Sequence, residues 1–228
     1  PEAFSIPLQR EFVEFIKKIT LFEQVFLIVA SPKLKDKVSV LLNSANVNLA
    51  NVSFVIQKTN RSWMRDSGPI LVKNENAVEC LDFNFNGWAK YTNYQLDKNV
   101  PKAVSGFFKL AITQVLYKGK PVTLEGGAVE VNGKGTLITT EECLLHPSVQ
   151  VRNAELSKTD YECIFKEYLG VSNVIWLKAG ILGDDTHGHI DDLCRFVNAN
   201  TIVTVVENDI KSVNYQILQD NLKRLKQA

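Results

Sequence analysis

The chain has 228 residues, of which 45% are hydrophobic and 22% charged, with a formal net charge of +1. That length is enough for one well-buried domain, and the composition is ordinary for a soluble globular protein. The balanced charge argues against nucleic acid or an anionic membrane surface as a partner, and no apolar run approaches the roughly 20 residues that span a bilayer.

The predicted elements are short and alternate between helices and strands. A helix over 7–19 is followed by a strand over 24–30, a helix over 31–43, strands over 52–57 and 69–73, and an extended segment over 77–85. Next come a helix over 104–110, extended segments over 112–117 and 121–124, and strands over 128–131 and 136–140 joined by a hairpin at Asn132-Gly133. A helix over 157–169, strands over 174–177 and 195–206, and an amphipathic helix from residue 213 complete a mixed α/β order.

Three acidic residues recur along this order. Asp66, Glu125 and Asp191 are about 60 residues apart, and each lies in an acidic loop or turn between two strands. Such a repeat brings an acid to the same end of each unit and suggests a propeller-like ring with a central site. An ordinary α+β domain with acidic loops is the alternative.

Three segments contain residues suited to chemistry. The loop WMRDSGP places Asp66 beside an aromatic wall at Trp63, which suits a flat cation, although a turn with locally paired charges is the alternative. Glu125 precedes two glycines that permit a sharp turn or a close approach to a ligand; an exposed Glu in a simple turn is the alternative. The segment GDDTHGHIDD holds two of the three histidines and four carboxylates, a concentration that is costly unless the charges are paired or used.

The third segment admits a zinc interpretation. THGHIDD resembles the THxHxDH signature of metallo-β-lactamase-like hydrolases, in which imidazoles and a carboxylate bind zinc. However, Asp192 replaces the last histidine of that signature, and no histidine follows His189. The four cysteines form no CxxC pair, so we expect reduced thiols in a cytoplasmic protein. A zinc-dependent hydrolase is a secondary alternative, and we expect no bound metal.

Taken together, four strings resemble the guanidine-modifying superfamily of five-bladed α/β pentein propellers, within it the agmatine deiminase and bacterial peptidylarginine deiminase branch. The strings are WMRDSGP, FNFNGW, LEGGAVEVNGKGTLITTEECLL and GDDTHGHIDD, and the resemblance runs from about Phe12 to the C-terminus. It implies a pentein-type α/β propeller of which the chain covers about three of five blades. Residues 1–228 would then form a single, incomplete deiminase domain.

The resemblance also implies a reaction. A cysteine thiolate attacks a guanidinium carbon, ammonia leaves, and water hydrolyses the covalent amidino-cysteine, without a cofactor. The implied substrate is agmatine, which yields N-carbamoylputrescine; arginine or peptidyl-arginine is a weaker option, and a homo-oligomer stays open. The matching positions are His189 as general acid/base, Glu125 as the acid near it, Asp66 and Asp191 as guanidinium-binding carboxylates, and Trp63, Trp88 and Asp185 as further substrate-binding residues.

The chain departs from the family pattern in two ways. None of its cysteines matches the nucleophile: Cys194 begins an apolar strand, and Cys143 matches a different family position. Ala89 follows FNGW where glycine is usual. We therefore expect that the chain as it stands does not turn over substrate. The alternative to an enzyme is a truncated, inactive guanidinium-binding module or pseudoenzyme.

Overall fold

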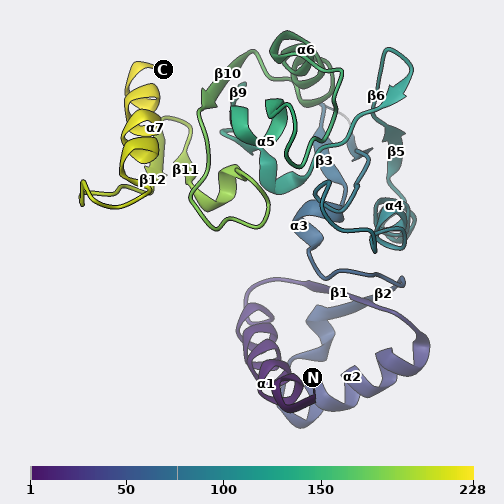
Figure 1. Cartoon of the computed structure of the whole chain (residues 1–228). Helices are drawn as coiled ribbons and strands as arrows, with labels where there is room; N and C mark the ends of the chain where they lie inside the picture. The colour runs from purple at the N-terminus through teal and green to yellow at the C-terminus, as the bar shows by residue number, and fades with distance from the viewer. Residues whose placement is uncertain (1, 76) are drawn as a thin grey trace.

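The computed structural model describes residues 2–75 and 77–228, with side chains from residue 8 onward (Figure 1). Its α-helices are α1 Glu2–Ile19, α2 Pro32–Ser44, α3 Met64–Ser67, α4 Val100–Phe108, α5 Glu141–Leu145, α6 Lys158–Leu169 and α7 Tyr215–Gln227. Its strands are β1 Val25–Val29, β2 Val52–Ile56, β3 Ile70–Lys73, β4 Val78–Asp82, β5 Ala111–Gln114, β6 Leu116–Tyr117, β7 Lys120–Pro121, β8 Glu130–Val131, β9 Thr136–Thr140, β10 Asn173–Leu177, β11 Cys194–Asn198 and β12 Thr201–Thr204. Short 3₁₀ turns are η1 Leu49–Asn51, η2 Asp97–Asn99, η3 Gly126–Ala128 and η4 Ile190–Asp192.

One strand–strand–helix–strand unit occurs twice. Strand β3 pairs antiparallel with β4, and the chain crosses through α4 and returns as β5, parallel to β4. In the same way β8 pairs antiparallel with β9, and the chain returns through α5 and α6 as β10, parallel to β9. The parallel pair β1–β2, joined through α2, corresponds to the strand–helix–strand part of this unit. The antiparallel pair β11–β12, followed by α7, corresponds to its two antiparallel strands and helix.

The repeat fixes where the acidic residues lie. A short helical turn immediately precedes the first strand of each unit: α3 precedes β3, η3 precedes β8, and η4 precedes β11. These turns carry or follow Asp66, Glu125 and Asp191, and η3 contacts both α3 and η4. Three positions far apart in the sequence therefore meet in the middle of the structure.

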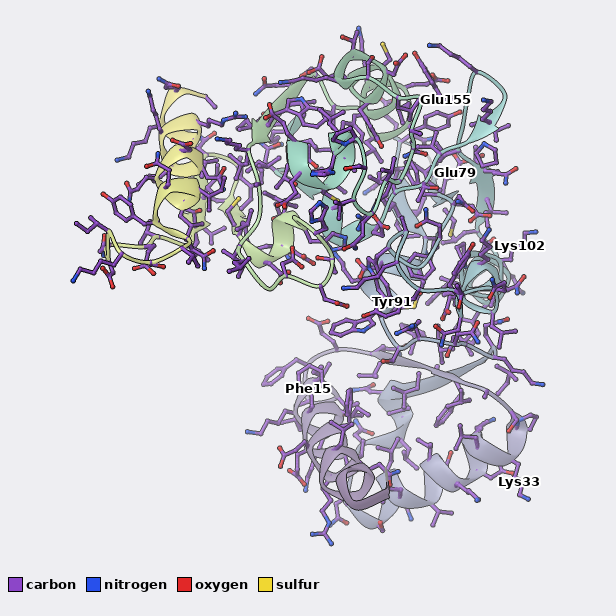
Figure 2. The ribbon with its side chains drawn as sticks, viewed as in Figure 1. Phe15, Lys33, Glu79, Tyr91, Lys102 and Glu155 are labelled. Atoms are coloured by element: carbon purple, nitrogen blue, oxygen red, sulfur yellow. The ribbon has the colours of Figure 1, made fainter. Side chains whose placement is uncertain are left out.

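Separate apolar clusters hold the units together. Around β8–β9–β10 the α6 residues Tyr161, Ile164 and Phe165 are fully buried. Helix α6 begins with a capping box at Ser157 and ends at Gly170, whose φ of 66° suits a residue without Cβ. A second cluster joins η4 and α7, and a third joins α1 and α2 to β1 and β2. Large apolar side chains also remain exposed, among them Phe15 on α1 (Figure 2).

Several predicted boundaries were wrong. The helix predicted over 104–110 spans Val100–Phe108 instead, because Pro101 suits a first helical turn and Lys109 ends the helix in the left-handed conformation. The extended segment predicted over 121–124 contributes only Pro121 to β7, and its Thr123 forms an isolated bridge with Asn84. Part of the loop predicted around Asp66 is helical, as α3. The strand pairing of the described residues closes no ring and does not establish a count of three blades. No helix among them has both the length and the apolar character to cross a bilayer.

Candidate active site

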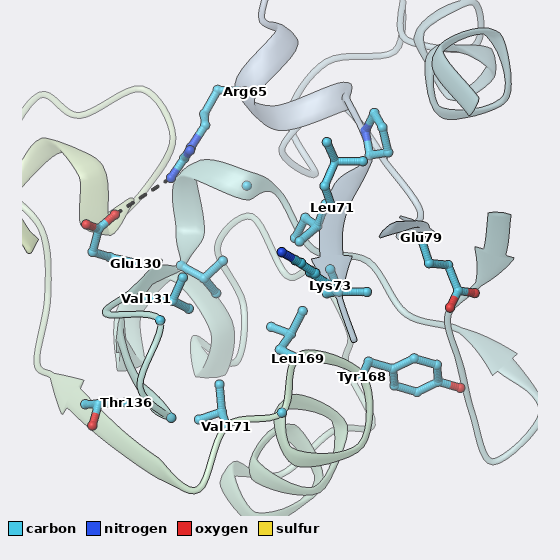
Figure 3. A pocket seen from close by; sticks show the side chains of 18 of the residues that line it. Arg65, Leu71, Lys73, Glu79, Glu130, Val131, Thr136, Tyr168, Leu169 and Val171 are labelled. Atoms are coloured by element: carbon cyan, nitrogen blue, oxygen red, sulfur yellow. Dashed lines mark ion pairs between the residues drawn. The ribbon is translucent and has the colours of Figure 1, made fainter. Parts of the chain in front are cut away.

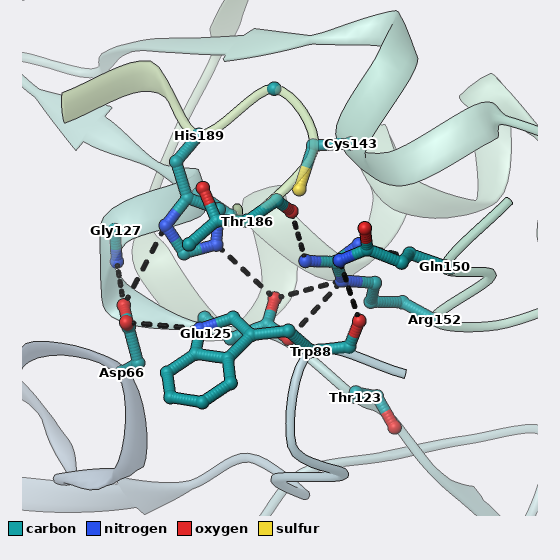
Figure 4. A network of polar contacts seen from close by, with 12 residues as sticks. Asp66, Trp88, Thr123, Glu125, Gly127, Cys143, Gln150, Arg152, Thr186 and His189 are labelled. Atoms are coloured by element: carbon teal, nitrogen blue, oxygen red, sulfur yellow. Dashed lines mark hydrogen bonds and ion pairs between the residues drawn. The ribbon is translucent and has the colours of Figure 1, made fainter. Parts of the chain in front are cut away.

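Three carboxylates from three repeat units surround one imidazole. Figure 4 shows two of them, Asp66 and Glu125, beside His189. Nδ1 of His189 lies 3.8 Å from Oδ1 of Asp66 and 3.8 Å from Oδ1 of Asp191. Its Nε2 lies 3.8 Å from Oε2 of Glu125, beyond hydrogen-bond distance, and has no hydrogen-bond partner. The side chains of Asp66, Glu125 and His189 are buried, whereas that of Asp191 is 22% exposed. The structure thus brings together the four residues predicted to form the centre of the site.

Gly127 makes this convergence possible. A Cβ at residue 127 would lie 2.5 Å from Nδ1 of His189, 2.7 Å from Oδ1 of Asp66 and 2.9 Å from Oδ2 of Asp191. Contacts this short would force the groups apart, so only glycine fits. The second glycine of the LEGG motif is therefore a requirement of the site rather than a feature of an exposed turn.

Asp66 is fixed by two donors. The backbone N–H of Gly127 donates to its Oδ1 at 3.1 Å, and Nε1 of Trp88 donates to its Oδ2 at 3.1 Å. Burial raises the pKa of Asp66; the nearby imidazole and the two donors lower it but do not fully offset burial. Trp88 is itself buried, so it acts on the site through the hydrogen bond that orients Asp66.

The turn that carries Trp88 has a rare backbone conformation. Gly87, Trp88 and Ala89 have φ values of 67°, 59° and 51°, so three successive residues lie in the left-handed region. The side chain of Asn86 accepts a hydrogen bond from the N–H of Ala89 at 2.8 Å. Left-handed backbone costs about 1–2 kcal/mol for a residue with a side chain, so the surrounding contacts must hold this turn in place.

Asp184 organises the loop that presents His189. Its Oδ1 accepts from the N–H of Thr186 at 2.7 Å, and its Oδ2 accepts from the N–H of Gly188 at 2.6 Å. His187 points elsewhere, with Nδ1 3.3 Å from a carboxylate oxygen of Glu142. Burial lowers the pKa of His187 despite that carboxylate. Within the described residues, the ligands that the zinc interpretation needs at residues 187, 189 and 191 do not converge.

Arg152 is a central residue that the sequence analysis missed. Its side chain is wholly buried, and its Nε donates to Oε1 of Glu125 at 3.2 Å. Burial alone would raise the pKa of Glu125, but the neighbouring His189 and Arg152 outweigh burial and lower it. Burial likewise opposes the charge on His189, yet Glu125, Asp66 and Asp191 together raise its pKa. The only signal in the sequence is one cation in the otherwise uncharged stretch HPSVQVRN.

The other predicted site residues lie at the rim. Trp63 is 62% exposed. Asp185 binds Nζ of Lys90 at 2.5 Å and accepts from the hydroxyl of Tyr91 at 2.8 Å. The guanidinium of Arg61 stacks 4.0 Å from the centre of the Tyr91 ring. These charged and aromatic groups border the buried cluster but do not enter it.

Two thiols lie near the site or in its supporting strand. The sulfur of Cys143 belongs to a group with Glu125 and His189 whose ligand atoms lie within 4.8 Å of one another. Burial raises the pKa of the Cys143 thiol, and Arg152 occupies one side of this group with a fixed cation. Cys194 is buried at the start of β11, and burial raises its pKa to about 12. Burial therefore disfavours the thiolate form of both thiols.

A separate cavity of about 980 Å³ opens between β3 and the β8–β9 hairpin (Figure 3). Leu71, Lys73 and Val131 line it, and Glu130 forms ion pairs at its edge with Arg65 at 3.8 Å and Arg195 at 3.0 Å. None of the four convergent side chains contributes to its lining. The titratable groups suited to acid–base chemistry lie in the polar convergence rather than in this cavity.

Known proteins with this sequence pattern and fold include agmatine deiminases. An agmatine deiminase of Pseudomonas savastanoi pv. phaseolicola is 33% identical over 215 residues, which cover 92% of this chain and 55% of that protein. A cysteine-to-serine variant of C. jejuni agmatine deiminase, solved with substrate bound, superposes with a TM-score of 0.83 at 31% identity and covers 99% of this chain and 63% of that one. The Enterococcus faecalis agmatine deiminase gives a TM-score of 0.81 at 28% identity, with 97% and 59% covered.

The chain spans about half the length of the curated relatives it matches. The solved relatives agree with the predicted α/β pentein-type fold. A family description, the Porphyromonas-type peptidyl-arginine deiminase, matches residues 3–228. The chain therefore belongs to the Porphyromonas-type peptidyl-arginine deiminase family.

Proposed function

We propose that this chain supplies the guanidinium-binding and proton-transfer residues of a hydrolase that converts agmatine to N-carbamoylputrescine and ammonia. The observation that carries the proposal is the meeting of Asp66, Glu125 and Asp191 at His189 around a glycine. Carboxylates at two sides of a planar cation can hold it in register through paired hydrogen bonds. Membership of a family whose relatives include agmatine deiminases supports the same reaction.

Each residue has a role in this proposal. Asp66 and Asp191 bind the guanidinium nitrogens, and Trp63, Trp88 and Asp185 complete the substrate-binding region. Glu125 keeps His189 in its protonated form, since the opposite charge nearby raises the imidazole pKa. His189 can then donate a proton to the departing nitrogen and later accept one from the attacking water.

The chemistry proceeds in two steps. A cysteine thiolate forms a C–S bond to the guanidinium carbon, and a C–N bond breaks as ammonia takes a proton from His189. Water then attacks the same carbon and gives one proton to His189. The C–S bond breaks to regenerate the thiolate, and the remaining hydroxyl proton passes to solvent, which leaves the neutral ureido product. The thiol is inferred from the family, and the substrate-bound relative with serine in place of cysteine is consistent with that role.

The rim cations do not by themselves choose between agmatine and arginine. Lys90 is paired with Asp185, whereas the Arg61 side chain donates to Oδ1 of Asn93 at 2.5 Å and stacks on Tyr91, and its Nε makes no hydrogen bond. Agmatine is preferred because relatives of this chain are agmatine deiminases.

The test compares agmatine, arginine and a peptide that ends in arginine. Calorimetry on the chain should give the strongest binding for agmatine, and Asp66→Asn should weaken it by about tenfold or more because one charged hydrogen-bond acceptor is lost. Asp82→Asn, in β4 away from the cluster, is the matched control and should bind as the parent does. Preferential binding of arginine would contradict the assignment of agmatine, and equal binding by Asp66→Asn would contradict the site.

A further inference from the structure

We propose that Arg152 is a positioning residue that clamps Glu125 and the loop that carries His189 into one rigid unit. This inference rests on the proposed function, since it concerns how the acid and the imidazole of that site are held. No motif of the sequence analysis includes Arg152, and its side chain has no exposed surface. Figure 4 shows it between the loop and Glu125.

The guanidinium of Arg152 bridges three segments. Its Nε donates to Oε1 of Glu125 at 3.2 Å, and Oε2 is 3.4 Å away. One terminal nitrogen, Nη1, donates to the carbonyl of Gln150 at 2.8 Å, and the other, Nη2, donates to the carbonyl of Thr186 at 2.6 Å. Only arginine offers a planar fork of donors that can serve all three acceptors at once.

The contact with Thr186 matters because this residue lies in the loop just before His189. Asp184 binds the N–H groups of Gly188 and His189, and the hydroxyl of Thr140 donates to the carbonyl of Gly188. The loop is thus anchored within itself and from β9, and Arg152 hydrogen-bonds both to this loop and to Glu125. In this proposal the Arg152 contacts help to hold the separation of 3.8 Å between Glu125 and His189.

The Arg152–Glu125 pair is fully buried, which raises the cost of removing either partner. Both side chains of the Arg152–Glu125 pair have no exposed surface, so removal of either leaves an uncompensated buried group. The ionisable groups that interact with Glu125 or His189, besides Arg152, are Asp66, Asp191, Asp184, Asp192, Cys143 and Tyr161. Without Arg152, we expect Glu125 to take up a proton, and the imidazole then loses one of its three neighbouring anions.

The first experiment is NMR titration of the imidazoles in the parent and in Arg152→Gln. If Arg152 keeps Glu125 ionised, the substitution neutralises Glu125 and the pKa of His189 falls. If the pair is only structural, Glu125 stays ionised, a nearby cation has been lost, and the pKa of His189 rises. A rise or no change would overturn the proposal. The assay uses no substrate, so it stands even if agmatine proves to be the wrong ligand.

The second experiment is amide hydrogen exchange in Arg152→Lys, which also decides the matter if Arg152→Gln does not fold. Lysine keeps the charge beside Glu125 but cannot reach both carbonyls. We expect the N–H groups of Gly188 and His189 to exchange about tenfold faster or more, with the His189 titration largely retained. Arg195→Lys, at the ion pair with Glu130, is the matched control and should leave the loop amides unchanged. Parent-like exchange in Arg152→Lys would contradict the clamp.

Discussion

At the scale of single residues, burial and neighbouring opposite charges have opposing effects on the pKa values of the site. Burial disfavours an imidazolium, while three carboxylate oxygens within 3.8 Å favour it, and the net effect is a raised pKa for His189. For Asp66 the balance is reversed, because burial outweighs one imidazole and two donors. The same cluster can therefore hold a protonated base and carboxylates of unequal basicity, which is what acid–base chemistry near neutral pH requires.

The raised pKa of His189 has a consequence for stability. A group whose pKa is higher in the folded than in the unfolded state contributes stability that is full below the unfolded value of about 6.5 and is lost as the pH rises through the folded value. Between pH 6 and pH 8 we expect the parent to lose more unfolding free energy than His189→Gln. Urea denaturation at both pH values measures it, with His146→Gln as the control. Equal losses in the parent and His189→Gln would contradict the pKa shift.

How far the sequence predicts the site depends on where each residue's partners come from. Local patterns of glycine, tryptophan or clustered charges singled out the segments that contain Asp66, Glu125, Asp191 and His189, and the family resemblance implied the role of each residue. Arg152 was not predicted, because it lies outside any motif and its buried contacts with Glu125 and Thr186 form only in the folded structure. Cys143 was judged from its family position alone, and its closeness to the imidazole follows from Thr140, which caps α5 through its side chain.

At the scale of elements, capped helices and hairpins were predicted well and short turns were not. Helix α2 begins after Ser31, whose side chain accepts from the N–H of Leu34 at 3.2 Å, as the Ser-Pro pair indicated. The hairpin at Asn132-Gly133 joins β8 to β9 as predicted. The short helix α3 and the turns η3 and η4 have no periodicity long enough to read, yet they carry or border the catalytic candidates.

The left-handed turn at residues 87–89 yields an element-scale prediction. Ala89 bears the strain of a left-handed conformation that glycine would adopt freely, so Ala89→Gly should raise the free energy of unfolding by about 1 kcal/mol. The matched control is Ala103→Gly within α4, also half-buried, where the same change should lower it by about 0.5–1 kcal/mol. Chemical denaturation measures both. A loss of stability in Ala89→Gly would show that the turn is not strained.

At the scale of the whole molecule, repetition explains how one chain builds a central site. Each unit begins with a short turn and an acid at the same end of its first strand, so placing the units side by side brings the acids together. The sequence predicted this from the spacing of about 60 residues. It could not predict which units would be complete, because a strand of two residues such as β8 carries no readable alternation.

The last prediction concerns turnover by the 228-residue chain, which we expect to bind agmatine without releasing ammonia. A nucleophile must lie within a few ångströms of the guanidinium carbon and be ionised. Among the described residues, burial raises the thiol pKa of Cys80, Cys143 and Cys194, and Cys163 is exposed on α6. The measurement is ammonia release from agmatine, beside calorimetric binding of agmatine to the same chain.

Two serine variants make that measurement decisive. Cys143→Ser and Cys194→Ser should change neither binding nor the absence of turnover, because neither thiol is expected to attack. If the 228-residue chain does release ammonia and Cys143→Ser abolishes it, the thiol beside Glu125 and His189 is the nucleophile. The Arg152 cation would then be the group that lowers the barrier to forming its thiolate, since a neighbouring positive charge stabilises that ion. If instead only Cys194→Ser abolishes ammonia release, the nucleophile is Cys194 at the start of β11.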